Sequence, residues 1–395
     1  MKKFILVPDS FKGSMSSSEI CEIMEESILT HYPGAQVVSI PVADGGEGSV
    51  DCFLSAVGGK KVFVTVKGPH FESTEAFYGI LPDGTAVIEM AACAGLPLVE
   101  NGKAVENSTT FGVGQLIIHA ASSGCKKIIV GLGGSATNDG GAGAAAAAGV
   151  QFFDAGGSEF IPVGKTLCQI GSIDSSGLLP VIKEAEIITM CDVDNPLCGE
   201  NGAAHVFGPQ KGADREMIKL LDESLAHMAK IIHRDLNVSI LDLPGSGAAG
   251  GLGGGMVAFF GSQMQMGIEA VLDVTGFDAR LKDADMVFSG EGRIDFQSLR
   301  GKVISGVARR AKRAGVPVVA IVGDIGDGIE TAHEIGLAGI FSINRVAVPF
   351  SEARLRCKSD LRLTMDNLLR YSREAAAAGM HTLVTRTGLD RRKID

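Results

Sequence analysis

The sequence lacks several features that would place it in a class at once. No apolar stretch approaches the roughly 20 residues of a membrane-spanning helix, and the apolar run at residues 4–7 ends at Pro8, too early for a signal peptide. Eight cysteines are scattered without a Cys-x-x-Cys pair, which argues against a disulfide framework or a zinc site and indicates a reduced, cytoplasmic protein. Basic residues are outnumbered, 36 against 46 acidic ones, and the formal charge of −10 argues against binding to nucleic acid or to an anionic membrane.

Tryptophan is absent, whereas glycine is abundant at 53 of 395 residues. So many glycines in an apolar chain indicate tight turns and places where the backbone approaches something closely. A phosphate-bearing ligand is one such partner, and an α/β protein with many short turns explains the glycine content equally well. The length exceeds what one hydrophobic core usually serves, so at least two domains are expected.

Five apolar segments near the two ends of the chain predict a single parallel sheet. The predicted strands lie at residues 3–7, 36–41, 285–289, 317–322 and 339–343. Predicted helices alternate with them, and the first carries a capping box formed by Ser16 and Glu19. Such alternation is typical of an α/β fold with a doubly wound, flavodoxin-like sheet.

The middle of the chain follows another pattern. Short predicted strands at 62–66, 75–80 and 85–90 are separated by turn residues and indicate hairpins, and a strand at 127–130 leads into a glycine-rich loop. We therefore expect a second α/β domain with a mixed sheet, inserted into the first. The expected boundaries are 1–50 and 281–380 for the flavodoxin-like domain and 51–280 for the insertion, with a tail of unassigned role at 381–395.

Ligands of doubly wound sheets bind beyond the carboxyl ends of the strands. The loops at 9–13, 44–48 and 290–295 should lie on that edge, and a cleft between the two domains is the expected active site. No Walker A loop occurs. Phosphoryl transfer nevertheless needs only phosphate donors, carboxylates for magnesium and a group that orients the acceptor hydroxyl, and these loops supply all three.

Each of these loops also has an ordinary structural explanation. Lys12 precedes the first helix, where an anion is favoured, yet it could be a solvated lysine in a turn. The loop at 131–139 could cradle phosphate or simply cap a helix. Asp192 and Asp194 follow an apolar strand and could bind magnesium or form a turn, and the acids flanking Arg293 could be an internal ion-pair group.

Six stretches taken together are more specific than any one of them. They are PDSFKGS at 8–14, ADGGEG at 43–48, GGSAT at 133–137, CDVDNPL at 191–197, VFGPQKG at 206–212 and GEGRID at 290–295. In this order they closely resemble the bacterial class I glycerate kinases, and the resemblance runs from residue 3 to about 370. Leu299 and Arg300 depart from the small residues expected before Gly301 and Lys302.

The resemblance implies ATP and Mg²⁺ as cosubstrates, D-glycerate as acceptor and a phosphoglycerate product, usually the 2-phosphate. It also implies a flavodoxin-like domain interrupted by a second α/β domain. The site residues that we infer from it are, for catalysis, Lys12, Asp44, Asp192 and Arg293; for the substrate, Asp9, Ser10, Lys12, Glu47 and Arg293; for the nucleotide, Gly133, Gly134, Ser135, Thr137, Asp139, Gln210 and Lys211; and for the metal, Asp192, Asp194, Glu291 and Asp295.

Two alternative functions fit the sequence less well. A non-catalytic sensor or binding protein for a small anionic metabolite would share a two-domain architecture, but it would not need acids beside phosphate loops. A dinucleotide-dependent dehydrogenase is excluded because no Gly-x-Gly-x-x-Gly motif follows the first predicted strand. A homodimer is left open.

Overall fold

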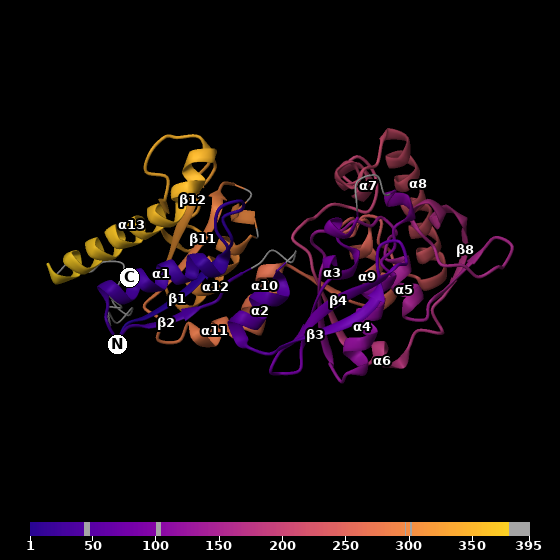
Figure 1. Ribbon diagram of the computed structural model, residues 1–395, viewed down its shortest axis with the longest axis horizontal. Helices are drawn as coiled ribbons and strands as arrows, with labels where there is room; N and C mark the ends of the chain where they lie inside the picture. The colour runs from indigo at the N-terminus through magenta and orange to yellow at the C-terminus, as the bar shows by residue number, and fades with distance from the viewer. Residues whose placement is uncertain (43–47, 100–103, 297, 301, 379–395) are drawn as a thin grey trace, which may run out of the picture. The chain divides into compact units, whose positions relative to one another are not determined.

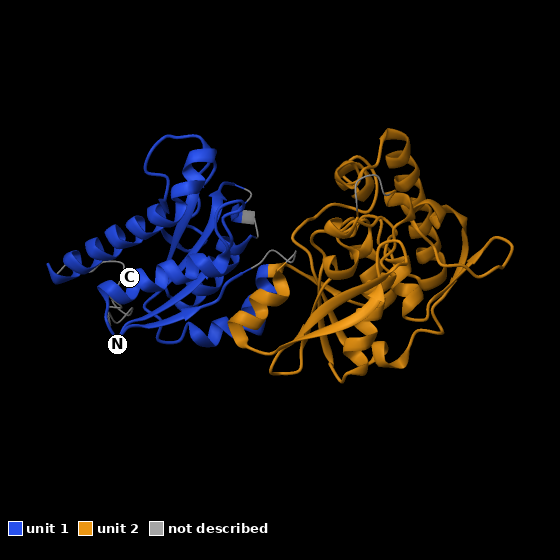
Figure 2. Ribbon diagram, viewed as in Figure 1, with its two compact units in different colours: residues 1–43, 268–395 blue, residues 44–267 orange. Residues whose placement is uncertain are grey.

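The chain forms two compact units, one of which interrupts the other. The computed structural model describes residues 1–42, 48–99, 104–296, 298–300 and 302–378. Unit 1 comprises residues 1–43 and 268–395, and unit 2 comprises residues 44–267 (Figure 2). Both are α/β units, so the expected fold class is confirmed.

Unit 1 is built from the first and the last parts of the chain (Figure 1). Its elements are β1 (Lys3–Pro8), α1 (Ser17–His31), β2 (Gln36–Ser39), α10 (Gly267–Val274), α11 (Phe277–Arg280), β11 (Met286–Ile294), the 3₁₀ turn η5 (Ser298–Arg300), α12 (Val303–Ala314), β12 (Val318–Ile325), β13 (Leu337–Ser342) and α13 (Phe350–Ala377). The first residue of α10, Gly267, belongs to unit 2.

The sheet of unit 1 has the strand order β13-β12-β11-β1-β2, and every neighbouring pair is parallel. Numbered within the unit, this order is 2-1-3-4-5, the flavodoxin-like arrangement. The order reverses between β1 and β11, which pair from Phe4 with Met286 to Pro8 with Gly290. In such sheets the ligand crevice lies outside the carboxyl ends of the strands at this switch point.

Helices α1 and α13 pack against one face of the sheet. Their apolar residues share a core with Phe4, Phe288 and Ile321. The capping box predicted for α1 is present, because the Ser16 hydroxyl accepts from the Glu19 backbone N–H at 3.2 Å and the Glu19 carboxylate accepts from the Ser16 N–H at 2.9 Å. This reciprocal pairing satisfies two backbone donors at the start of the helix.

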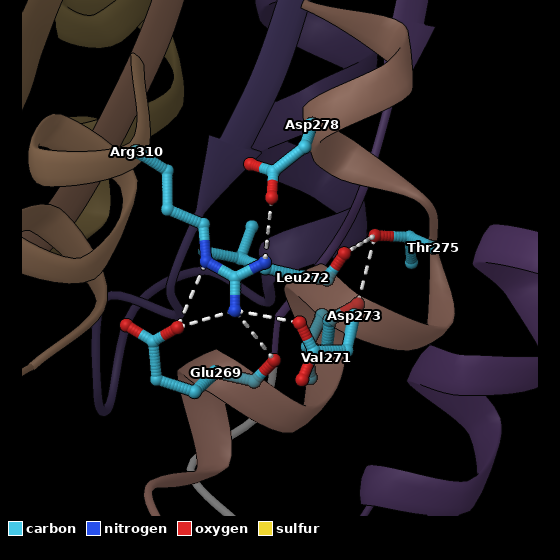
Figure 3. A network of polar contacts seen from close by, with 7 residues as sticks. All are labelled: Glu269, Val271, Leu272, Asp273, Thr275, Asp278 and Arg310. Atoms are coloured by element: carbon cyan, nitrogen blue, oxygen red, sulfur yellow. Dashed lines mark hydrogen bonds and ion pairs between the residues drawn. The ribbon is translucent and has the colours of Figure 1, made fainter. Parts of the chain in front are cut away.

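Arg310 of α12 ties α10 and α11 to the rest of unit 1 (Figure 3). The side chain is 9% exposed and reaches three carboxylates: Glu269 at 2.8 Å from Nε, Asp273 at 2.6 Å from Nη2 and Asp278 at 3.4 Å from Nη1. The fork of donors suits several acids at once. Close approach of α10 to α12 is possible because Gly306 has no side chain; a Cβ there would lie 3.0 Å from Ile268.

Strand β11 is longer than the sequence predicted. The expected strand ended at residue 289 and a loop followed, but the ladder with β12 continues to the pair Ile294–Ile325. The prediction was wrong because Gly290 and Gly292 suggested a turn, whereas here they let neighbouring backbone approach. A Cβ at Gly290 would collide with the carbonyl oxygen of Ile321. Glu291 and Arg293 are therefore held on a strand.

Unit 2 contains a mixed sheet surrounded by helices. Its elements are α2 (Ser49–Val57), β3 (Lys60–Lys67), β4 (Ser73–Ile80), β5 (Ala86–Glu89), α3 (Ala91–Ala94), η1 (Leu96–Leu98), η2 (Val105–Asn107), α4 (Phe111–Ser122), β6 (Lys127–Gly131), α5 (Ala142–Ala147), β7 (Gln151–Asp154), η3 (Gly164–Gln169), β8 (Ile170–Asp174), α6 (Pro180–Lys183), β9 (Glu186–Met190), α7 (Ala203–Phe207), η4 (Pro209–Lys211), α8 (Arg215–Leu236), α9 (Leu252–Phe260) and β10 (Gln263–Gln265).

The strand order in the large sheet of unit 2 is β10-β9-β6-β5-β4-β3. Strands β3, β4 and β5 are antiparallel, as the predicted hairpins require, and the other neighbouring pairs are parallel. The mixed sheet is thus confirmed. The β7–β8 hairpin and the three-residue β10 were not predicted, since short strands give little periodicity to detect.

Many glycines of unit 2 serve backbone packing. The loop after β6 meets the glycine-rich segment before α9, and the Gly140 N–H donates to the Gly250 carbonyl oxygen at 3.0 Å. At Gly250 and at Gly255 a Cβ would collide with a carbonyl oxygen of the facing loop. For these glycines, the close partner that their abundance indicated is another part of the same unit.

None of the helices in the described part of the chain is both long and apolar enough to cross a membrane.

Candidate active site

In unit 1, the predicted site residues gather where β1 and β11 end. The Asp9 N–H donates to the Gly290 carbonyl oxygen at 2.8 Å, which joins the loop after β1 to β11. A tight turn follows, in which the Phe11 N–H donates to the Met15 carbonyl oxygen at 2.9 Å. A Cβ at Gly292 would lie 3.7 Å from the backbone nitrogen of Lys12, so this turn lies directly against the end of β11.

The loop between β1 and α1 presents Lys12 at the surface, with Asp9 and Ser10 half-buried. We expected the N-terminus of α1 to attract an anion, but the Glu19 carboxylate already occupies that position through the capping box. A helix N-terminus whose backbone N–H groups are already paired with the protein's own carboxylate binds a phosphate less well. The exposed Lys12 side chain is therefore the cationic group with which this loop can meet an anion.

Glu291 is the buried acid of this cluster. The residue is 5% exposed, and its Oε1 atom has no hydrogen-bond partner among the residues that the structure describes. Burial raises the pKa of Glu291 to about 7; the Ser298 hydroxyl and Lys302 oppose the rise, while Asp9 and Asp295 add to it. These influences come from the loop after β1, from the end of β11 and from the start of α12, so they mark one local cluster.

The raised pKa of Glu291 predicts how the free energy of unfolding depends on pH. Because the folded state holds the Glu291 proton more tightly than the unfolded state does, stability should fall as pH rises from 4.5 to about 7. We expect Glu291→Gln, which mimics the protonated form, to match the wild type near pH 4 and to be more stable by about 2–3 kcal/mol at pH 8.

Chemical unfolding of the two proteins at pH 4 to 8 measures this difference. The neighbouring exposed acid Asp324, replaced by asparagine, is the matched control and should give no such divergence. A constant difference between Glu291→Gln and wild type across this pH range would contradict the prediction.

Arg293 and Asp295 complete the end of β11. Arg293 is exposed, and its guanidinium lies against Gly326, where a Cβ would be 3.1 Å from Nε. Asp295 and Ser298 form a reciprocal turn, with backbone-to-side-chain hydrogen bonds of 3.3 Å in both directions. This turn fixes where the chain leaves β11. The sequence signal for Ser298 was weak, and we did not select it.

In unit 2, the glycine-rich loop after β6 is joined to the turn η4 by a buried lysine. Lys211 is 7% exposed, and its Nζ donates to the Ser135 hydroxyl at 2.8 Å and to the Thr137 carbonyl oxygen at 2.7 Å. The structure thus brings together two stretches, 133–139 and 210–211, that we predicted as nucleotide-binding. Gly134 and Gln210 are exposed.

Asp139 lies inside this loop and serves the loop itself. The residue is fully buried and accepts from the Thr110 N–H at 2.7 Å, the Thr110 hydroxyl at 2.9 Å, the Gly141 N–H at 3.1 Å and the Gly143 N–H at 3.2 Å. Donors at the start of the six-residue α5 are thereby used by a protein carboxylate. What the loop can offer a phosphate is the backbone at Gly133 and Gly134, because Gly134 is exposed whereas Ser135 is only 7% exposed and Thr137 is fully buried.

Asp192 and Asp194 lie where β9 ends, as predicted, and both are exposed. The Asp192 carboxylate accepts from the Gly267 N–H at 2.8 Å and so caps the first turn of α10. Burial raises the pKa of the neighbouring Cys191 to about 11, with Asp192 and Asp194 adding to the rise. Cys191 is thus an unreactive thiol, consistent with a small packing residue.

Asp44 and Glu47 lie outside the described residues. The segment that follows them is anchored by Glu89, which we did not predict. Its carboxylate is 2% exposed and accepts from the Gly48 N–H at 3.2 Å and the Val50 N–H at 2.5 Å, at the start of α2. Burial raises the pKa of Glu89. The sequence signal that could have identified Glu89 is an acidic residue at the end of an apolar strand.

The acids that we expected to bind metal belong to different units: Glu291 and Asp295 to unit 1, Asp192 and Asp194 to unit 2. Within the described part of the chain, no three His, Cys, Asp or Glu side chains form a group that could hold a metal ion. Mg²⁺ is commonly bound by one or two carboxylates together with substrate phosphates and water, and hard oxygen ligands of that kind are present.

Comparison with known proteins gives a consistent result. The model of the glycerate kinase family matches residues 4–373. A glycerate 2-kinase from Escherichia coli is 44% identical over 95% of this chain and 97% of its own length, and a glycerate kinase from Bacillus cereus is 44% identical over 93% and 97%. The crystal structure of a protein assigned as glycerate kinase 2 from Salmonella typhimurium superposes with a TM-score of 0.84 at 42% identity, covering 95% of this chain and 99% of that one. The chain therefore belongs to the glycerate kinase family, whose activity is the ATP-dependent phosphorylation of glycerate.

Proposed function

We propose that this protein transfers the γ-phosphoryl group of ATP to D-glycerate with the help of Mg²⁺ and releases 2-phosphoglycerate and ADP. The observation that carries the proposal is the cluster at the switch point of unit 1. There Lys12, Glu291 and Arg293 lie around the ends of β1 and β11, where flavodoxin-like sheets bind ligands. The family membership supplies the acceptor.

Charge explains what unit 1 would contribute. Glycerate carries a carboxylate, and phosphoryl transfer spreads negative charge over the equatorial oxygens. The exposed side chains of Lys12 and Arg293 would bind and neutralise these groups, with Asp9 and Ser10 beside them. Asp44, Asp192 or Asp194 would then accept the proton of the acceptor hydroxyl.

Unit 2 would hold the nucleotide phosphates. The backbone at Gly133 and at the exposed Gly134 would supply donors, and the hydroxyl of the buried Ser135, which accepts from Lys211, would add a further group. Gln210, exposed on η4, adjoins the same loop through Lys211. The sequence-based expectation that both units contribute to one cleft remains a prediction.

The chemistry of the candidate ligands suits a magnesium ion, which prefers carboxylate oxygens. Asp192 and Asp194 are exposed carboxylates, and the Oε1 of the buried Glu291, which has no partner within the described part of the chain, is an atom that a cation would satisfy. Asp192, Asp194, Glu291 and Asp295 are the candidate ligands. When bound, Mg²⁺ neutralises the phosphate oxygens and favours in-line transfer. A nearby cation would also lower the raised pKa of Glu291 and keep it ionised.

Turnover with D-glycerate is the direct test. We expect ADP release that requires D-glycerate, ATP and Mg²⁺ together, and we expect phosphorus NMR of the product to match authentic 2-phosphoglycerate. L-Glycerate is the matched control acceptor and should react at least about 10-fold more slowly. A site that holds both the carboxylate and the hydroxyl distinguishes the two configurations at the carbon that bears that hydroxyl.

Two outcomes would contradict the proposal. A product that matches 3-phosphoglycerate would reject the assigned regiochemistry alone. A rise in unfolding temperature on adding D-glycerate, without any ADP release, would instead identify a sensor for a small anion.

A further inference from the structure

Lys211 joins two segments that are distant in sequence. It belongs to the 3₁₀ turn η4 and reaches Ser135 and Thr137, more than 70 residues earlier in the chain. Both contacts are short, at 2.8 and 2.7 Å, and the residue is 7% exposed. The lysine ammonium thus makes its hydrogen bonds on the buried side of the loop after β6, away from solvent.

The rest of that loop is held by backbone and by Asp139. The Leu96 N–H donates to the Gly134 carbonyl oxygen at 2.9 Å, and the Ala136 N–H donates to the Ala94 carbonyl oxygen at 2.9 Å. Asp139 fixes the opposite end through its bonds to Thr110 and to the start of α5. Lys211 acts between these two anchors, through the buried Ser135 of the turn at 133–135, in which Gly134 is exposed.

The charge on Lys211 is sensitive to its surroundings. Burial lowers the pKa of Lys211 to about 7, and the carboxylate of Asp139 opposes the fall. Among the described residues, Asp139 is the charged group whose field acts on it. An anion placed at the turn in front of Lys211 would favour the charged ammonium further, because opposite charges attract strongly in a buried site.

We propose that Lys211 is a positioning residue, which holds the 133–135 turn in shape for the phosphates of the nucleotide, and that nucleotide binding at this turn is coupled to the uptake of a proton by Lys211. The proposal rests on the proposed function of this loop and adds a regulation to it. Lys211 does not itself touch the nucleotide; its effect passes through Ser135 and the Thr137 carbonyl oxygen.

The test measures ATP binding to the full-length protein by calorimetry at pH 6 to 9 in buffers with different heats of ionisation. Three variants accompany the wild type: Lys211→Met removes the donor, Lys211→Arg keeps a permanent charge, and Lys219→Met is the matched control on the exposed surface of α8, where Lys219 is 77% exposed. The terminal phosphate of ATP also titrates near neutral pH. The readout is therefore the difference in proton uptake between the wild type and each variant.

The expected results differ between the variants. Wild type and Lys219→Met should take up more protons than Lys211→Arg, with the largest difference between pH 7 and 9. Lys211→Met should bind ATP at least about 10-fold more weakly and raise the KM for ATP, with an unchanged KM for D-glycerate, since its loss disturbs a turn that faces the nucleotide.

Proton uptake by Lys211→Arg equal to that of the wild type would overturn the coupling, and wild-type ATP affinity in Lys211→Met would overturn the positioning role. If Lys211→Met fails to fold, Lys211→Arg together with Ser135→Ala decides the matter, and unchanged ATP affinity in Ser135→Ala overturns the positioning role. ADP release by the wild type reports separately on the proposed function. ATP binding with the expected proton uptake but without turnover would reject that function and leave the inference about Lys211 standing.

Discussion

Lys12→Ala should lower kcat/KM for D-glycerate by about 10²–10³-fold, equivalent to about 3–4 kcal/mol of lost transition-state stabilisation. The side chain is exposed at the surface of unit 1, and its backbone lies against the end of β11 at the switch point of the sheet. A cation there can neutralise charge that grows during phosphoryl transfer. Steady-state measurement of ADP release over a range of D-glycerate concentrations tests this.

The fold should survive the Lys12→Ala substitution. The turn around Lys12 is held by backbone hydrogen bonds between Phe11, Ser14 and Met15, none of which uses the lysine side chain. Lys312→Ala, at another exposed lysine of unit 1, on α12, is the control and should keep wild-type kinetics. Activity of Lys12→Ala within threefold of wild type would show that Lys12 is an ordinary surface lysine.

Gly250→Ala should destabilise unit 2 by about 4 kcal/mol. The residue has a φ of +67°, which costs an L-amino acid about 1–2 kcal/mol. The added Cβ would also lie 2.5 Å from the Asn138 Cα and collide with the Thr137 carbonyl oxygen. Backbone on both sides has little room to yield, so overpacking adds a further few kcal/mol. Because the chain has no tryptophan, circular dichroism is the suitable probe of denaturant unfolding.

Gly261→Ala separates the two causes. Gly261 has nearly the same backbone angle, with a φ of +61°, but a Cβ there would meet no atom of the described residues within 4 Å. We expect a loss of about 1 kcal/mol for this control, from the backbone angle alone. Equal losses of unfolding free energy for the two variants would mean that the loops at 140 and 250 can move apart without destabilising the unit.

The sequence predicted the architecture well where local physics and tertiary packing agree. The capping box of Ser16 and Glu19 gave the start of α1 because both partners lie within one helical turn. Strand alternation gave the flavodoxin-like sheet of unit 1. The end of β11 was missed, since glycines at 290 and 292 have the same local preference in a turn as in a crowded central strand.

The candidate site was predicted by chemical type, and the structure distinguishes roles within it. Gly134 and Asp139 were selected together as nucleotide ligands, yet burial separates the exposed Gly134 from a carboxylate that accepts hydrogen bonds from Thr110 and from the start of α5. Glu89 was not selected at all, because its role depends on a helix start 41 residues earlier. Which atom faces solvent is a tertiary property that spacing in the sequence does not carry.

The pairing of β1 with β11 has a consequence for biosynthesis. Phe4 pairs with Met286, so the pairing of β1 with β11 must wait until the whole of unit 2 has been translated, roughly 10–50 s at ordinary ribosome speeds. During that time apolar residues of β1 such as Ile5 and Leu6, both fully covered in the finished protein, can pair with β2 but lack β11, their neighbour on the other side. Early folding of unit 2 shortens the open loop that must close and lowers its entropic cost. A substitution that unfolds only the insertion should therefore also expose the nascent N-terminus to aggregation and chaperones.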